Sequence, residues 1–247
     1  MNRPAAHQAE APAQIIARAQ EVGRHALDEA AAKRILAAYG LTVPRGVTWR
    51  PGTALDLDGI PAPFAAKMIC PGLLHKSDAG GVKVGLSDAA EVLATVRGFE
   101  SAARTSGLRL EGVLIEEMAP PGVELVVGGV IDERFGPVLM LGMGGVYVEL
   151  FGDTVFRVCP ITRRDAQTMI DALRSAPLLR GARGRAAVDE SLIASALLAV
   201  GGDAGLLMEL QHQVAELDIN PLIVSARGAY ACDARILLPE IAGNGLA

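Results

Sequence analysis

The last part of the chain carries oxygen-bearing side chains at a spacing that would bring them together. In residues 216–220 (ELDIN), polar residues alternate with apolar residues. Side chains two positions apart on a β-strand point to the same face, so the polar ones would share one face. If residues 225–228 form the loop between two antiparallel strands, the register places Asn220 directly opposite Asp233.

This opposed pair would suit a metal site. Directly opposed residues have Cβ atoms roughly 4.5–5.5 Å apart. A carboxylate and an amide oxygen at that separation fit a hard cation such as Mg²⁺, which prefers oxygen ligands completed by phosphate and water. The alternative is a polar hairpin surface that faces the solvent, with Pro221 disturbing the register.

A lysine stands in an otherwise apolar run. Lys67 lies within residues 63–69 (PFAAKMI), which are apolar enough to form a buried strand. Burying an unpaired ammonium costs several kcal/mol, so a buried Lys67 needs an anionic partner. The alternative is an edge strand from which Lys67 reaches water along its apolar stem.

Residues 75–82 (HKSDAGGV) form the densest group of reactive side chains. They combine a titratable nucleophile, His75, with a cation, a hydroxyl and a carboxylate. The adjacent Gly80 and Gly81 have backbone N–H groups that could approach a phosphate closely. The segment matches neither of the two best-known phosphate loops, and the alternative is a solvated surface turn.

Further features would suit a nucleotide. Residues 116–119 (EEMA) leave carboxylates and backbone groups at a strand end, where they can bond an adenine edge or a ribose. Glu124 would start the next strand, residues 142–145 (GMGG) would permit close backbone approach, and Arg157 is a cation within a β-run that could meet phosphate. Turn glycines and an exposed strand arginine are the structural alternatives.

The first half of the chain predicts helices that flank short strands. Apolar residues at every fourth position form one stripe of a helix over residues 26–39, which Gly40 ends. A second helix would start at a Ser87 cap and continue to about Ser106. The strands expected here are residues 46–49 and 64–69, with a loop over residues 73–81.

The second half predicts many strands, then helices and a final hairpin. The expected strands are residues 112–118, 123–131, 138–141, 147–150 and 154–158, and the helices are residues 163–174 and 190–200. The hairpin comprises residues 214–224 and 229–237. This order predicts an α+β protein with two lobes, residues 25–107 and 108–247, after a flexible N-terminal tail of residues 1–24.

The composition excludes several classes of protein. Hydrophobic residues make up 51% and charged residues 21% of the 247 residues, which excludes a disordered or fibrous chain. The net charge of −5 lacks the basic footprint of a nucleic-acid binder. The mean hydropathy is +0.32, but the most apolar stretch, residues 192–202, is shorter than the roughly 20 residues of a membrane span. We therefore expect a cytoplasmic protein with neither a nucleic acid nor a membrane as partner.

Taken in order, these segments resemble a known family. The chain is similar to the ATP-grasp β subunit of the ADP-forming (NDP-forming) acyl-CoA synthetases, typified by ADP-forming acetyl-CoA synthetase, and more distantly to succinyl-CoA synthetase β. The resemblance covers about residues 25–240. It rests on residues 37–44 (AAYGLTVP), Lys67, residues 75–82, residues 116–118 (EEM), residues 135–138 (FGPV), residues 142–145 and residues 216–222 (ELDINPL).

The resemblance implies a fold, a reaction and cofactors. The fold would be ATP-grasp, in which two α+β lobes hold ATP or GTP with Mg²⁺ between them. The reaction would be carboxylic acid + CoA + ATP ⇌ acyl-CoA + ADP + phosphate, through an acyl-phosphate and a phosphohistidine. His75 matches a family histidine that relays phosphate, and our hypothesis is that it is a transient phosphoryl acceptor.

The resemblance also assigns binding roles to residues of this chain. Lys67 would hold α/β-phosphate oxygens. The other expected contacts are the phosphate-covering loop (Gly80, Gly81, Val82), the adenine pocket (Glu116, Ala119), the ribose (Glu124) and Mg²⁺ (Asn220, Asp233). Asp218 stands where the family has an acidic residue, either as a further ligand or behind the ligands.

The expected partner is a CoA-binding α subunit. The sequence contains no CoA-binding Rossmann segment and no second catalytic-histidine segment, so we expect activity only with an α subunit, in an α₂β₂ assembly. The chain could instead be one part of a larger fused protein. Two alternative functions are a regulatory ATP-grasp-like domain associated with a protein acetyltransferase and a nucleotide-binding homologue without turnover.

Overall fold

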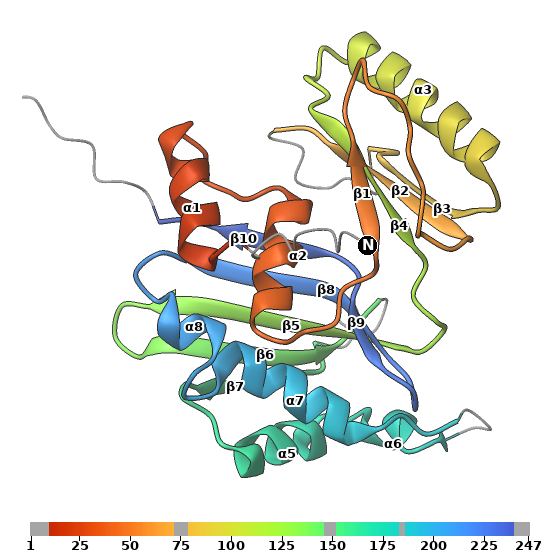
Figure 1. Cartoon of the computed structure of the whole chain (residues 1–247). Coiled ribbons are helices and arrows are strands. Elements are labelled where there is room, and N and C mark those ends of the chain that lie inside the picture. Colours follow the sequence, from red (N-terminus) through yellow and green to blue (C-terminus); the bar gives the residue numbers. More distant parts are fainter. Residues whose placement is uncertain (1–9, 72–78, 146–151, 183–185, 240–247) are drawn as a thin grey trace, which may run out of the picture. The chain divides into compact units, whose positions relative to one another are not determined.

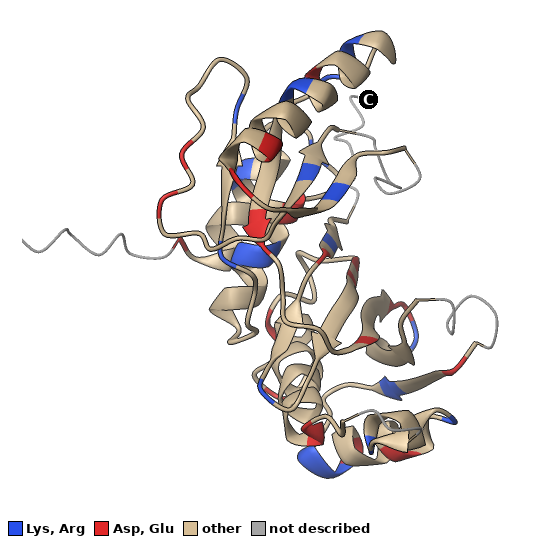
Figure 2. Ribbon diagram, turned by 90° about the vertical axis from the view of Figure 1, so that its right-hand side faces the viewer, with Lys and Arg blue, Asp and Glu red and all other residues tan. Residues whose placement is uncertain are grey.

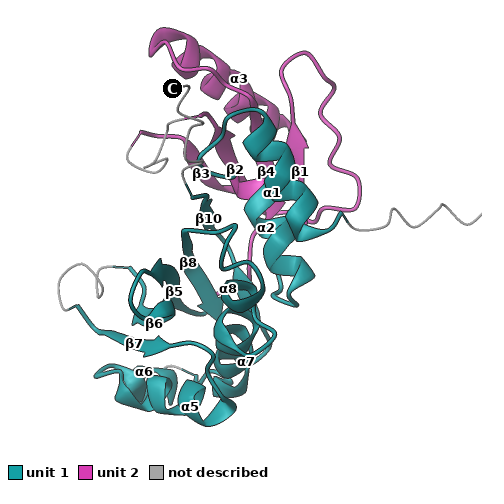
Figure 3. Ribbon diagram, turned by 90° about the vertical axis from the view of Figure 1, so that its left-hand side faces the viewer, with its two compact units in different colours: residues 1–27, 31–42, 122–247 teal, residues 28–30, 43–121 magenta. Residues whose placement is uncertain are grey.

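The computed structural model describes residues 10–71, 79–145, 152–182 and 186–239 (Figure 1). The chain divides into two compact units (Figure 3). Unit 1 comprises residues 1–27, 31–42 and 122–247, and unit 2 comprises residues 28–30 and 43–121. The predicted boundary at residues 107/108 therefore falls too early, because the strand that follows it completes the sheet of unit 2.

Unit 2 is an antiparallel four-stranded sheet with one long helix. Its strands have the order β1-β4-β2-β3. The bounds are β1 (Gly46–Trp49), β2 (Phe64–Ile69), β3 (Val82–Leu86), α3 (Ala89–Thr105) and β4 (Gly112–Glu117). Strand β3 was not predicted, since Lys83 and Gly85 interrupt its apolar residues and leave no continuous apolar run.

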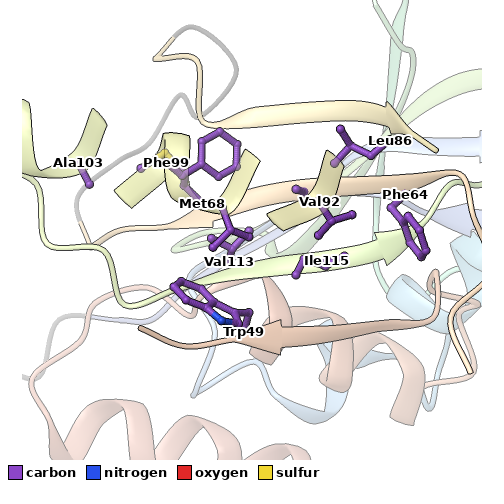
Figure 4. Close-up of a cluster of buried hydrophobic side chains, with 11 residues drawn as sticks. Trp49, Phe64, Met68, Leu86, Val92, Phe99, Ala103, Val113 and Ile115 are labelled. Carbon is purple, nitrogen blue, oxygen red and sulfur yellow. The ribbon is translucent and has the colours of Figure 1, made fainter. Parts of the chain in front are cut away.

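The core of unit 2 lies between α3 and one face of this sheet. Met68 and Ile115 from the strands meet Val92 and Phe99 from the helix (Figure 4). Because neighbouring strand residues point to opposite faces, Lys67 lies on the face away from this core. Helix α3 is capped by Asp88, whose carboxylate accepts a hydrogen bond from the Glu91 backbone N–H, one residue after the predicted cap.

Unit 1 is a larger antiparallel sheet with helices. The strand order is β10-β8-β5-β6-β7, and β9 pairs with β8. The strands are β5 (Val123–Asp132), β6 (Gly136–Met143), β7 (Thr154–Val158), β8 (Glu216–Val224), β9 (Ala229–Ala231) and β10 (Ala234–Leu237). The helices are α1 (Pro12–Glu21), α2 (Glu29–Ala38), α5 (Arg163–Ala172), α6 (Ala176–Leu179), α7 (Glu190–Gly201) and α8 (Leu206–Glu209). The first two residues of α2 are grouped with unit 2. The predicted strand at residues 147–150 lies outside the described residues.

Helices of unit 1 cover one face of its sheet (Figure 3). Gly129 on β5 allows close packing there, because a Cβ at this position would lie 2.5 Å from Cδ1 of Leu207 on α8. Residues 190–209 are long and apolar enough to cross a membrane by length and composition alone, but 56% of that stretch is buried in the structure. Ile193 and Leu197 of α7 are fully buried, as in the core helix of a globular unit.

The flexible tail predicted for residues 1–24 is wrong for helix α1. Its Ile15, Ile16 and Ala19 are buried, and Pro12 occupies the first turn, where its missing N–H costs nothing. The Ala- and Pro-rich composition of this segment obscured a short apolar stripe. Charged residues of both signs are interspersed over both units (Figure 2).

Candidate functional site

Lys67 is buried in unit 2 with two carboxylates. Its Nζ lies 2.6 Å from Oε1 of Glu29 and 3.2 Å from Oε2 of Glu116. Only 7% of Lys67, 4% of Glu29 and 2% of Glu116 is exposed. The prediction that a buried Lys67 needs an anionic partner is confirmed. The edge-strand alternative is wrong, because β2 lies between β4 and β3.

Strand register explains how Glu116 reaches the lysine. Lys67 is paired with Leu114, and Ala65 is paired with Glu116, on the neighbouring strand β4. Lys67 and Glu116 are therefore diagonal neighbours on one face of the sheet, within reach of a long side chain. Glu116 was predicted to line an adenine pocket, and the structure places its carboxylate against the Lys67 ammonium.

Glu29 is the member of the Lys67 cluster that sequence reasoning missed. It comes from the first turn of α2, and no spacing rule connects it with a strand residue so far along the chain. The requirement for a counter-charge was a signal that a partner exists, but it did not select among the acidic residues.

The predicted phosphate-covering loop, residues 80–82, is only partly a loop in the structure. Val82 is the first residue of β3 and is paired with Lys67, so its predicted place in a flexible loop is wrong. Gly81 accepts a hydrogen bond from the Met68 N–H at 2.8 Å, and Gly80 has a φ of +67°, which favours glycine. His75 lies outside the described residues. Ala119 is half-buried in the segment after β4.

In unit 1, the predicted register of the terminal hairpin is confirmed. Val224 is paired with Ala229, and Ile219 is paired with Ala234, so Asn220 and Asp233 oppose each other. The Asn220 backbone N–H donates to the Asp233 carbonyl at 3.2 Å.

The hairpin pairing also passes through the proline. The Pro221 carbonyl accepts a hydrogen bond from the Cys232 N–H at 2.9 Å, so Pro221 does not disturb the register of the hairpin. The register shift of β8 at this point is on its other side, where β8 pairs with β5.

Asp218 lies on the same strand in a setting unfavourable for its negative charge. Burial raises the pKa of Asp218, and the carboxylates of Asp233 and Glu216 raise it further, while Arg235 lowers it. Arg235 is its cross-strand partner on β10, and Gly128 is its partner on β5. A cation bound here would offset this accumulation of negative charge.

The donor set fits Mg²⁺ in chemical type. Asn220 is exposed and Asp233 is half-buried, so both stand where a ligand can approach. Among the described residues, no group of three or more His, Cys, Asp and Glu side chains could hold a metal. Mg²⁺ at Asn220, Asp233 and Asp218 would therefore need oxygens from water or a ligand's phosphates, as is usual for this ion.

A shallow apolar hollow adjoins Asp218 on the face of the sheet away from the helices. It has a volume of about 160 Å³ and is lined by Gly128, Gly129, Val130, Val138, Met140, Phe156, Glu216, Leu217 and Asp218. Phe156 is 61% exposed, so this face carries uncovered apolar surface. A Cβ at Gly128 would lie 3.1 Å from Cε of Met140 and would begin to fill the hollow.

Two other predicted residues of unit 1 are not brought together with Asp218. Arg157 on β7 is paired with Leu139, which is paired in turn with Gly129, the residue that contacts the helices. Arg157 therefore faces the helix-covered side of the sheet, opposite to the side of Asp218, and its contact with phosphate stays a prediction.

Glu124 begins β5 and is exposed, as expected of a residue at a strand start. Its carbonyl accepts from the Gly144 N–H at 2.7 Å, and a Cβ on Gly144 would lie 2.9 Å from the Glu124 backbone. Gly144 thus allows its own backbone to approach the backbone of the neighbouring strand β5 closely.

These features define a two-unit α+β protein with a buried lysine cluster in one unit and oxygen donors on a β-hairpin of the other. Residues 18–238 match the model of the ATP-grasp domain family. The chain therefore belongs to the ATP-grasp family, as the sequence resemblance predicted.

The similar proteins are acyl-CoA ligases. The chain is 39% identical over 229 residues to the Acetate–CoA ligase [ADP-forming] I subunit beta of Pyrococcus furiosus, which covers 91% of this chain and 97% of that one. It is 36% identical to subunit beta of ligase II from the same organism, covering 87% and 93%. Acetate–CoA ligase [ADP-forming] I of Archaeoglobus fulgidus is longer, and the 38% identical match covers only 30% of it.

The chain is also similar to solved structures of an acetyl-coenzyme A synthetase. Acetyl-coenzyme A synthetase 1 of Ca. Korarchaeum cryptofilum, in complex with coenzyme A and Ca-AMPCP, has a TM-score of 0.83 at 37% identity, covering 92% of this chain and 99% of that chain. A structure of the same protein with coenzyme A and Mg-AMPPCP has a TM-score of 0.78 at 36% identity, covering 93% and 100%.

Proposed function

We propose that this chain is the nucleotide-binding β subunit of a cytoplasmic ADP-forming acyl-CoA synthetase. The reaction would be carboxylic acid + CoA + ATP ⇌ acyl-CoA + ADP + phosphate. One observation carries the proposal: the match extends over 97% of a relative that is itself named as the β subunit of an ADP-forming acetate–CoA ligase. The Lys67 cluster and the Asn220–Asp233 pair supply the chemical groups that such a role requires.

The residues that the family resemblance assigns to the nucleotide and its metal ion occur in both units. Lys67 would bind phosphate oxygens through its ammonium, and the strand end from Glu116 to Ala119 would bind the base through its backbone groups. Asn220 and Asp233, with Asp218, would hold Mg²⁺. When bound, the metal ion neutralises phosphate charge that develops during phosphoryl transfer.

His75 would accept the phosphoryl group. In this step an N–P bond forms at a ring nitrogen as the P–O bond to ADP breaks, so the imidazole must be neutral to act as nucleophile. The histidine would then pass the group on towards the site where the acid is activated. This role rests on the family resemblance.

The proposed partner is a separate CoA-binding α subunit, in an α₂β₂ complex. Support for a separate partner comes from the two P. furiosus relatives, which are named as β subunits and have nearly the same extent as this chain. The longer relatives indicate that the same domain also occurs within larger chains.

Binding of Mg-ATP and Mg-GTP to the isolated chain, measured by calorimetry, tests the nucleotide role. We expect saturable binding that Asp233→Asn weakens and that Asp203→Asn, at an exposed site between α7 and α8, leaves unchanged. No heat with either nucleotide on folded wild-type chain would refute the proposal.

Reconstitution tests the catalytic role. With a CoA-binding α subunit we expect ATP-dependent acyl-CoA formation, and neither subunit alone should form it. His75→Ala should abolish turnover but retain nucleotide binding. A His75→Ala enzyme with normal turnover would contradict the role of His75 alone.

A further inference from the structure

Glu29 makes the shortest described contact to the Lys67 ammonium. Its Oε1 lies 2.6 Å from Lys67 Nζ, against 3.2 Å for Oε2 of Glu116. Its side chain is only 1% exposed, and that of Lys67 is 9% exposed. At this distance and burial, the contact is a charge-assisted hydrogen bond with little solvent screening.

Glu29 and Glu116 approach the lysine from different elements. Glu116 is a diagonal neighbour in the same sheet, whereas Glu29 is supplied by the first turn of α2. The strand on the other side contributes the apolar Val82 opposite Lys67. The ammonium is thus held both along the sheet and from outside it, so its position is determined by two separate parts of the chain.

A buried lysine binds an anion well only if it is charged and in place. Burial favours the neutral amine, which does not attract phosphate, and a nearby carboxylate restores the charged form. A long, flexible side chain also loses rotamer freedom when it binds a ligand. A carboxylate that already fixes it reduces that loss.

We propose that Glu29 is a positioning residue for nucleotide binding, which acts by holding the Lys67 ammonium charged and fixed on the face of the unit 2 sheet away from α3. This inference rests on the proposed function, since it takes Lys67 to be the phosphate ligand. Glu29 itself makes no contact with the nucleotide in this arrangement. Its effect on affinity is therefore entirely dependent on Lys67.

The test is the Kd for Mg-ATP of folded variants, measured by calorimetry. Glu29→Gln keeps the size and hydrogen-bonding capacity of the side chain but removes its charge, and it should raise Kd about tenfold. Glu29→Asp keeps the charge on a shorter stem and should restore part of the affinity. Glu10→Gln is the matched control, because Glu10 forms an ion pair with Arg34, which lies on α2 as Glu29 does. Oε2 of Glu10 is 3.1 Å from Nη1 of Arg34. It should leave Kd unchanged.

A double-mutant cycle separates positioning from general support of the fold. Glu29→Gln should have no further effect on Kd when Lys67 is already replaced by Gln, because the two residues act as one unit. An equal effect in both backgrounds would overturn the proposal, as would an unchanged or lower Kd for Glu29→Gln alone. If Lys67→Gln does not fold, Kd for Glu29→Asp decides: a value no better than that of Glu29→Gln overturns it.

Failure of the proposed nucleotide-binding function can be distinguished from failure of the positioning role of Glu29. If wild-type chain binds no Mg-ATP, the proposed function fails and this inference fails with it. If wild-type chain binds and Glu29→Gln binds equally well, only the positioning role is refuted.

Discussion

The two charged clusters of the molecule are built on opposite principles. In unit 2, Lys67 lies between Glu29 and Glu116, so buried charges of opposite sign are within hydrogen-bonding or ion-pair distance. In unit 1, the carboxylates of Asp218, Asp233 and Glu216 gather near one another, and the pKa of Asp218 is raised. In the first cluster the chain itself pairs an ammonium with two carboxylates, whereas the second would gain from an added cation. Under the proposed function, the first cluster would supply an ammonium for phosphate and the second would receive a metal ion.

Removing the ammonium of the Lys67 cluster should have the largest effect. Lys67→Met would remove the ammonium that the buried Glu29 and Glu116 carboxylates contact, and we expect the free energy of unfolding to fall by about 3–5 kcal/mol. Urea unfolding measures this change. A loss below about 1 kcal/mol would mean that water reaches the cluster, and its contrast with the hairpin would then disappear.

A pair of adjacent glycines tests the sheet that supports the second cluster. Gly129→Ala would place a Cβ 2.5 Å from Cδ1 of Leu207, while Gly128→Ala would meet the flexible end of Met140 at 3.1 Å. We expect Gly129→Ala to lower the free energy of unfolding by about 1–3 kcal/mol, and Gly128→Ala to have a smaller effect. Each variant is the control for the other, because both add a methyl group to the same strand. Equal losses in urea would contradict the assignment of one face to helix packing and the other to a ligand.

The pH dependence of the metal-free chain should reveal the unfavourable setting of Asp218. Its pKa is raised in the folded state, so its favourable contribution is present at low pH and is lost as the pH rises through the folded value. In EDTA at pH 7, Asp218→Asn should therefore have a higher free energy of unfolding than wild type, by less than about 1 kcal/mol, measured by urea unfolding. This difference should vanish in acid. Added Mg²⁺ and ATP should stabilise the wild type more than the variant. An advantage that persists in acid would show that charge is not its cause.

An exposed ion pair should have the smallest effect and sets the baseline for the buried cluster. Nη2 of Arg45 lies 2.9 Å from Oε2 of Glu117, and the side chain of Arg45 is 66% exposed. The hydrogen bond that Arg45 donates lowers the pKa of Glu117. Arg45→Met should lower the free energy of unfolding by about 0.2–1 kcal/mol at pH 7. Because the folded pKa of Glu117 is depressed, this contribution is lost as the pH falls through that value, so the two proteins should converge in acid. A loss as large as that of Lys67→Met would erase the distinction between buried and exposed pairs.

The predictability of the site depended on the distance in sequence between its parts. Asn220 and Asp233 were predicted to oppose each other because a short loop determines the register of a hairpin, and β8, β9 and β10 have that register. The pairing of Lys67 with Glu29 could not be predicted, because it depends on how a helix and a sheet pack in three dimensions. The sequence indicated only that some carboxylate was needed.

The same reasoning explains the errors in the fold. Helices with a regular apolar stripe, such as α3, were predicted within a few residues. Helix α1 was missed because a short stripe in an Ala- and Pro-rich segment resembles a tail. Strand β3 was missed because its residues are mostly exposed, so hydrogen bonding to β2 rather than burial defines it.

The turn at residues 225–228 has a consequence for natural variation. It closes β8 onto β9, and the register that it sets continues to Asp233. Removing or adding one residue there would move the carboxylate to the opposite side of the ribbon. Homologues that retain this aspartate should therefore differ in this turn by substitution, while insertions and deletions should be confined to other surface segments.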